Sequence, residues 1–135
     1  MSSERFQRTR DDHRRETSED YVEMIAGILD ERGKVKVVEL AERLGVSHVA
    51  VSRKLGRLRR EGLLEEGPSR EIALTEAGRK LAHVAKDRHQ VVLEFLLLLG
   101  VKQDVADHDA EGIEHHVSPE TLQAMREFVN AQRGT

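Results

Sequence analysis

The spacing of apolar residues along the chain is mostly that of amphipathic helices. In residues 17–32, Tyr21, Ile25 and Ile28 recur every three or four positions with polar residues between them, and Gly33 follows. This period places the apolar side chains on one face of a helix, and glycine is common just after a helix end. The N-terminal region therefore predicts a helix that stops before this glycine.

The later apolar periods predict more helices and one short hairpin. A helix over residues 38–44 is followed by a Leu-Gly-Val-Ser turn, and Ser47 is a suitable N-cap for a helix that runs to about Glu61. Residues 63–74 hold a Gly-Pro-Ser tip between two short apolar runs, which predicts two short strands. The other predicted helices run from Thr75 to about Leu99, from Gln103 to about His116, and onward from Pro119, with Ser118 as its cap.

Helix, helix, tight turn, helix and two-stranded wing is the order of a winged helix-turn-helix domain. The apolar residues around its turn that are expected to pack inward are Leu40, Ala41, Leu44 and Val46, followed by Val51, Leu55 and Leu58 in the next helix. We predict a mostly α-helical protein with a small β wing, in which a winged helix-turn-helix precedes an α-helical domain. The predicted parts are an N-terminal arm at residues 1–16, the winged helix at residues 17–75 and the helical domain at residues 76–135.

The amino-acid composition favours a helical fold and excludes several kinds of functional site. Charged residues make up 35% of the chain and aromatic residues 3%, so the core must be aliphatic, which suits helices. The chain has no cysteine, which excludes disulfides, zinc fingers, iron–sulfur ligation and thiol catalysis. A metal could be held only by Asp, Glu and His. No apolar N-terminal segment resembles a secretory signal, and the run at residues 95–101 is too short to cross a bilayer, so we expect a cytoplasmic protein with no membrane contact.

Basic residues gather on the helix after the tight turn. The net charge of −3 favours no partner by itself, but no acid lies between Leu44 and Arg60, a stretch that contains the basic residues Arg53, Lys54, Arg57, Arg59 and Arg60. This local pattern is typical of phosphate contact, and the exposed start of such a helix reads base edges. The predicted DNA-binding residues are Ser47, His48, Val49, Ser52, Arg53 and Arg57, with Arg53 placed to read guanine and Val49 a thymine methyl group. The alternative is a solvated basic helix or a winged helix that binds protein.

Acids and histidines gather elsewhere. Asp20 and Glu23 are spaced i,i+3 on the first helix, while Glu111, Glu114 and His115 are spaced i,i+3,i+4 near the C-terminus. Such groups could hold a cation, but helix-dipole acids and a solvated acidic face give the same spacing. His89 lies on an apolar stripe, where it is either a neutral core residue or a neutral metal ligand. Neither the HExxH zincin motif nor paired Glu-x-x-His motifs of a di-iron bundle are present.

Four blocks in order resemble the manganese-responsive branch of the diphtheria toxin repressor family. They are EDYVEMI at 19–25, the winged helix at 37–64, RHQVVLEFLLLLGV at 88–101 and DAEGIEHHVS at 109–118. The resemblance implies that one or two Mn²⁺ ions per subunit, or Fe²⁺ in their place, are held by Asp20, Glu23, His89, Glu111, Glu114 and His115. The iron branch typically has Met at the position of Asp20 and Cys at that of Glu111, so the two oxygen ligands favour manganese.

The same resemblance implies a function. The chain is expected to be a manganese-dependent regulator, mainly a repressor of manganese-uptake genes, that binds a palindromic double-stranded DNA operator as a metal-loaded homodimer, with no catalytic residues and no organic cofactor. Its dimer surface is predicted to include Phe95, Leu98, Leu122, Met125 and Phe128. The alternatives are an iron-responsive repressor of this family, a winged-helix regulator indifferent to metal, and a carboxylate/His metalloenzyme, which would need an open coordination position and a substrate cleft.

Overall fold

The computed structural model describes residues 18–66 and 71–134, which form two compact units that divide between His83 and Val84. The predicted arm at residues 1–16 and the tip of the predicted wing at residues 67–70 lie outside the described residues. Within the described part, no helix has the length and apolar character needed to cross a membrane.

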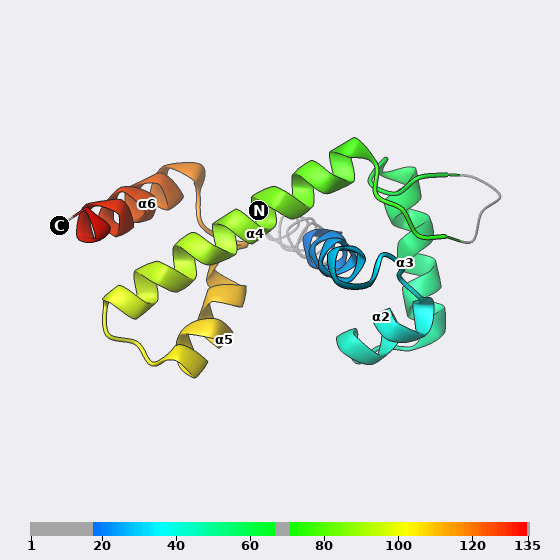
Figure 1. Cartoon of the computed structure of the whole chain (residues 1–135), viewed down its shortest axis with the longest axis horizontal. Coiled ribbons are helices and arrows are strands. Elements are labelled where there is room, and N and C mark those ends of the chain that lie inside the picture. Colours follow the sequence, from blue (N-terminus) through cyan, green and yellow to red (C-terminus); the bar gives the residue numbers. More distant parts are fainter. Residues whose placement is uncertain (1–17, 67–70, 135) are drawn as a thin grey trace, which may run out of the picture. The chain divides into compact units, whose positions relative to one another are not determined.

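The N-terminal unit contains a first helix at residues 18–32, α2 at Val37–Leu44 and α3 at His48–Arg60, and it takes in the start of α4, Glu76–Leu98 (Figure 1). The side chain of Ser47 accepts a hydrogen bond from the Ala50 N–H at 3.1 Å, so the predicted cap of α3 is confirmed.

The core of this unit confirms the predicted apolar faces. Its buried residues are Tyr21, Val22, Ile25, Ile28, Val35, Leu40, Ala41, Val51, Leu55, Leu58, Leu64, Ile72, Leu74 and Ala82. The prediction for Val46 was wrong, because this side chain is 41% exposed. Gly45 ends α2 with a φ of 67°, a conformation that glycine adopts without strain, and the chain then runs along the surface, so that residues 45–50 are all exposed.

The predicted wing is reduced to one antiparallel bridge between Leu64 and Leu74 in the described residues. The Glu65 N–H donates to the Ala73 carbonyl at 2.8 Å on one side of the bridge, and the Thr75 N–H donates to the Leu63 carbonyl at 3.1 Å on the other. Both bridge residues are buried in the core of the unit, whereas the charged residues that follow Leu64 are exposed. Packing thus fixes the base of the wing without extended strands.

The C-terminal unit consists of the rest of α4, α5 at Gln103–Ile113 and α6 at Pro119–Arg133. We expected α5 to reach His116, but it ends earlier, and residues 114–116 form a turn in which the His116 N–H donates to the Ile113 carbonyl at 3.0 Å. Pro119 disfavours helical backbone at Ser118, which caps α6, so residues 114–118 connect the two helices.

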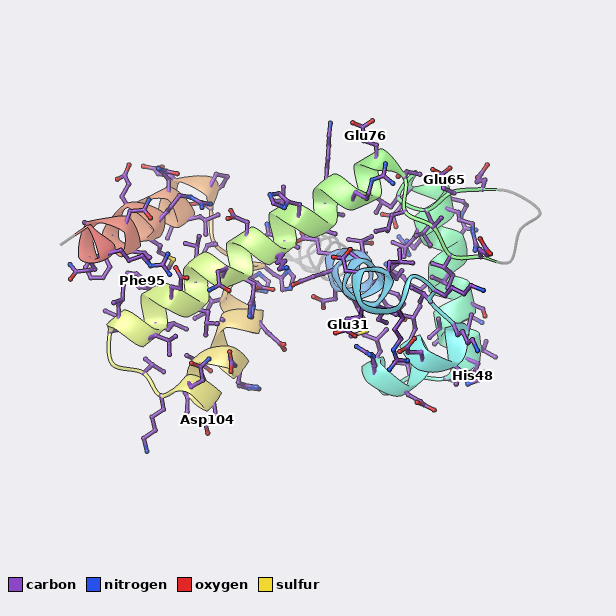
Figure 2. The ribbon with its side chains drawn as sticks, viewed as in Figure 1. Glu31, His48, Glu65, Glu76, Phe95 and Asp104 are labelled. Carbon is purple, nitrogen blue, oxygen red and sulfur yellow. The ribbon has the colours of Figure 1, made fainter. Side chains whose placement is uncertain are left out.

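Side-chain pairs join α4 to α6 in this unit. Arg126 binds Asp87 with a closest N–O distance of 2.7 Å, and Arg133 pairs with Glu94. Phe95, labelled in Figure 2, packs edge-to-face on Phe128 with ring centroids 5.4 Å apart. This ring arrangement is favourable for aromatic pairs and holds the C-terminal helix against the end of α4.

Candidate metal centre and nucleic-acid interface

A buried carboxylate lies between two imidazoles in the C-terminal unit. Glu114 is 3% exposed; its Oε2 lies 2.5 Å from His89 Nδ1, and its Oε1 lies 3.5 Å from His115 Nε2. Burial of a carboxylate costs free energy unless charged or hydrogen-bonding groups compensate for the lost water. Three of the six predicted metal ligands are therefore together, in an environment that a surface acid would not occupy.

The local sequence explains how these three side chains meet. His89 lies in the middle of α4 with the buried residues Ala85 and Val92 on the same face. Glu114 follows the last residue of α5, where its backbone N–H still donates to Ala110, and His115 lies in the turn that follows. The side chain of His115 is 5% exposed, whereas His116 is exposed, so the two adjacent histidines lie in different environments.

Glu111 differs from Glu114. It is exposed on α5, and within the described part of the chain it makes no hydrogen bond or ion pair. The predicted shared face of Glu111, Glu114 and His115 assumed a helix through His116; Glu114 still has helical backbone at the cap of α5, whereas His115 lies in the turn that follows. Its assignment as a ligand stays a prediction.

The other two predicted ligands belong to the N-terminal unit. Asp20 is exposed and Glu23 half-buried, one turn apart on the first helix. Taken together, the six predicted residues offer four carboxylates and two imidazoles and no sulfur. Oxygen and imidazole donors suit Mn²⁺ and Fe²⁺, so the residues present fit the expected metal.

The predicted DNA-binding residues surround the turn between α2 and α3. His48 begins α3 (Figure 2), and it, Ser52 and Arg53 are exposed, while Val49 is 66% exposed. An apolar side chain this exposed at the start of a helix has no role in the core of its own unit. The Ser47 oxygen is already used as the cap of α3, although its hydroxyl can still donate.

Two basic side chains of α3 contact other residues of the same unit. Arg57 Nε lies 3.7 Å from Glu61 Oε1, and Lys54 Nζ donates to Ser18 Oγ at 2.9 Å. Burial is the main cause that lowers the pKa of Lys54; Glu61 opposes it, and Arg57 adds to it. Lys54 is thus a half-buried structural group rather than part of the exposed basic stripe. The sequence does not predict that Lys54 contacts Ser18 and Glu61, because nothing in the sequence distinguishes these two residues from other serines and glutamates.

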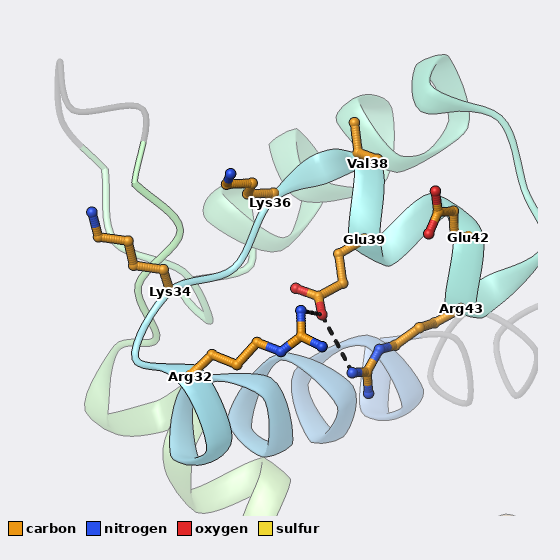
Figure 3. Close-up of a pocket in the computed structure, with 7 residues that line it drawn as sticks. All are labelled: Arg32, Lys34, Lys36, Val38, Glu39, Glu42 and Arg43. Atoms are coloured by element: carbon orange, nitrogen blue, oxygen red, sulfur yellow. Dashed lines mark hydrogen bonds and ion pairs between the residues drawn. The ribbon is translucent and has the colours of Figure 1, made fainter.

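A pocket of about 460 Å³ is formed by the end of the first helix, the loop after it and α2. Figure 3 shows the residues that line it. It is lined by Arg32, Lys34, Lys36, Val38, Glu39, Glu42 and Arg43. The Glu39 carboxylate pairs with Arg32 at 2.7 Å and with Arg43 at 3.3 Å. The Arg32–Glu39 pair joins the first helix to α2, whereas the Glu39–Arg43 pair lies within α2, and the predicted metal ligands do not line this pocket.

The predicted dimer residues lie in α4 and α6. Leu98 is 47% exposed and Phe128 is 39% exposed, whereas Phe95, Leu122 and Met125 are half-buried. Leu99, at 58%, and Val105, at 46%, add exposed apolar surface that the sequence did not assign.

Comparison with known proteins identifies both parts of the chain. Residues 14–72 match the family described as iron dependent repressor, N-terminal DNA binding domain, and residues 75–133 match iron dependent repressor, metal binding and dimerisation domain. The chain is 50% identical over 125 residues to transcriptional regulator MntR of Escherichia coli O6:H1, covering 93% of this chain and 81% of the relative. It is 33% identical over 111 residues to the HTH-type transcriptional regulator MntR of Geobacillus thermodenitrificans, covering 82% and 79%.

Solved structures give the same result. A manganese-dependent transcriptional repressor in complex with manganese superposes with a TM-score of 0.75 at 30% identity, covering 84% of this chain and 52% of that one. The manganese regulator SloR superposes with a TM-score of 0.74 at 29% identity, covering 84% and 53%. The chain spans about half the length of these solved structures. It belongs to the iron-dependent repressor family, in the branch that includes the MntR proteins, and is a transcriptional regulator rather than an enzyme.

Proposed function

We propose that this chain is a manganese-dependent transcriptional repressor, mainly of manganese-uptake genes, that binds a palindromic operator as a homodimer. The observation that carries the proposal is the buried Glu114 carboxylate between His89 and His115, inside the region that matches a metal-binding and dimerisation domain. The MntR relatives and the manganese-bound solved neighbour support manganese as the metal. We place the protein in the cytoplasm, where it would meet chromosomal DNA.

The proposed ligand set joins the two units. Asp20 and Glu23 bring carboxylates from the first helix, next to the DNA-binding elements, and His89, Glu111, Glu114 and His115 bring donors from α4 and the region of α5. A bound divalent cation supplies positive charge that offsets the repulsion among four carboxylates. The six side chains would then hold the first helix to the dimerisation unit, and this restrains the two recognition helices of a dimer to a spacing of about 34 Å, one turn of DNA.

The donor types bear on which metal is sensed. Oxygen ligands at Asp20 and Glu111 suit a hard ion, and Mn²⁺ binds most ligand sets more weakly than its competitors do. Selection of Mn²⁺ must therefore depend on coordination number and geometry as well as on affinity. An iron-responsive repressor with the same fold is the alternative, and it predicts a stronger response to Fe²⁺ than to Mn²⁺.

Operator binding should depend on manganese. The duplex is first selected from a random-sequence pool with the Mn²⁺-loaded protein, and its Kd is then measured anaerobically with EDTA, Mn²⁺, Fe²⁺ and Zn²⁺. We expect Mn²⁺ to tighten binding by about 5- to 150-fold, the range of ordinary coupling between two sites. A Kd that is the same in EDTA and Mn²⁺ would contradict the proposal in favour of a metal-independent winged-helix regulator.

Arg53 should read one base pair. We expect Arg53→Ala to weaken binding of the selected duplex by about 1–3 kcal/mol and to abolish the preference at a single operator position, because a bidentate contact to guanine would be lost. Binding to a library of single-base operator variants measures this. The matched control is Arg59→Ala on the same helix, which should weaken all sequences alike. If Arg53→Ala also gives a uniform loss, Arg53 contacts phosphate and not a base.

A further inference from the structure

The side chain of Ser18 is the centre of a hydrogen-bond network inside the N-terminal unit. Ser18 is 4% exposed, its Oγ accepts from Lys54 Nζ at 2.9 Å, and its hydroxyl donates to Glu61 Oε1 at 3.3 Å. Glu61 Oε1 also lies 3.7 Å from Arg57 Nε. One hydroxyl thus links Lys54 and Glu61, and Glu61 in turn pairs with Arg57.

These contacts leave the hydroxyl little freedom. A serine hydroxyl has one proton to donate, and here it is directed to the Glu61 carboxylate, while its oxygen faces an ammonium that can only donate. Hydrogen bonds to charged partners are stronger than those between neutral groups, and they favour one geometry. A shift of the first helix along α3 would break both bonds and leave the half-buried Lys54 without its oxygen acceptor.

The network connects the turn that carries a predicted metal ligand to the helix that carries the predicted DNA-binding residues. Ser18 precedes Asp20 by two residues and lies in the same turn of the first helix. Lys54 projects from the middle of α3, while Glu61 stands at its C-terminal cap. Arg57, a predicted DNA-binding residue, pairs with the same Glu61 carboxylate that accepts from Ser18.

We propose that Ser18 is a positioning residue that couples the metal-binding turn at Asp20 to the recognition helix α3 through Lys54 and Glu61. The inference rests on the proposed function, since it concerns how manganese occupancy reaches the DNA-binding surface. Metal coordination by Asp20 would fix the turn that carries Ser18, and the hydrogen bonds of Ser18 with Lys54 and Glu61 would hold that turn to α3. If this network carries the coupling, breaking it must change how much Mn²⁺ tightens DNA binding. The test must therefore measure the effect of Mn²⁺ on the Kd for DNA, and not DNA affinity alone.

The test is a double-mutant cycle on the coupling factor, the ratio of the Kd for the selected duplex in EDTA to that in saturating Mn²⁺. We expect Ser18→Ala and Lys54→Met each to lower this factor roughly threefold to tenfold. The double variant should lose no more than the larger single loss, because both changes break the same link. Ser18→Thr keeps the hydroxyl and should restore the wild-type factor.

The matched control is Arg60→Met, which also removes one positive charge from α3 but lies outside the network. It should weaken DNA binding equally with and without Mn²⁺ and leave the factor unchanged. Thermal melts of each variant identify any that fail to fold, and Lys54→Met provides the test if Ser18→Ala is one of them.

The outcomes separate this inference from the proposed function. If wild type itself shows no response to Mn²⁺, the proposed function fails. If wild type responds and the folded Ser18→Ala and Lys54→Met variants keep its full coupling factor, only the inference fails. Titration of Mn²⁺ into the DNA-free protein gives a further check: Ser18→Ala should keep the wild-type Mn²⁺ affinity within about twofold, and a loss equal to the loss of coupling would assign Ser18 to metal binding instead.

Discussion

Glu114→Gln is expected to abolish the response of DNA binding to manganese. The amide has the shape of the carboxylate and can still accept a hydrogen bond from His89, so the fold of the C-terminal unit should persist. It carries no charge, however, and its oxygen is a poorer ligand for a hard cation. We expect the coupling factor, about 5- to 150-fold for coupled sites, to fall to about one.

The control for this variant is Asp109→Asn. Asp109 lies on α5, is exposed, and makes no hydrogen bond or ion pair within the described part of the chain, so this variant makes the same change of charge away from the buried cluster. It should keep the wild-type coupling factor. Mn²⁺ binding is measured for both variants together with operator binding. A Glu114→Gln protein that still binds Mn²⁺ and still responds would remove Glu114 from the ligand set.

The elements of this fold could be predicted because their causes are local. The apolar period of residues 21–28 and the caps at Ser47 and Ser118 act within one or two helical turns, and the structure contains all of them. The convergence of His89, Glu114 and His115 was different. Spacing left a solvated acidic face open as an alternative, and the family resemblance was needed to connect residues in separate helices.

The errors arose from a local turn at Val46 and from a contact between distant residues at Lys54. Val46 has the apolar character of a core residue, but the left-handed Gly45 before it directs the chain along the surface. The sequence pattern groups Lys54 with the exposed basic residues of α3. Its contact with Ser18 depends on the fold, because the two residues lie far apart in the sequence. Glu111 and Glu114 keep their helical spacing, because Glu114 still has helical backbone at the cap of α5, and burial distinguishes the two carboxylates.

Burial thus divides the acids of this chain in a way that charge patterning could not. Many of its carboxylates are exposed, while Glu19 and Glu114 are each 3% exposed, and Glu114 lies against two imidazoles. An exposed acid contributes little free energy by itself, whereas a buried one must be compensated, which makes it the more informative residue for function. The family resemblance makes Glu111 the residue that bears most on the choice of metal, and burial makes Glu114 the residue that most favours the proposed site.

Gly78→Ala is expected to destabilise the N-terminal unit strongly. Gly78 is buried in the first turn of α4, where its N–H donates to Thr75 Oγ1 at 3.0 Å. A methyl group added here would lie 2.1 Å from the Leu63 carbonyl oxygen and 3.1 Å from Leu74 Cδ2. That oxygen already accepts from the Thr75 N–H at 3.1 Å, so α4 cannot move away without breaking the bond that holds the base of the wing. Overpacking of this kind costs about 3 kcal/mol or more.

Thermal unfolding followed by circular dichroism measures the effect, and a loss of this size lowers Tm by roughly 10 °C in a protein of this length. The control is Gly27→Ala in the first helix, where an added methyl group meets nothing within 4 Å. It should raise stability by about 0.5–1 kcal/mol, because alanine favours helix and restricts the unfolded chain. If the two variants melt at the same temperature, the close approach of α4 to the Leu63 backbone does not exist in solution, and the attachment of α4 to the winged helix must be different.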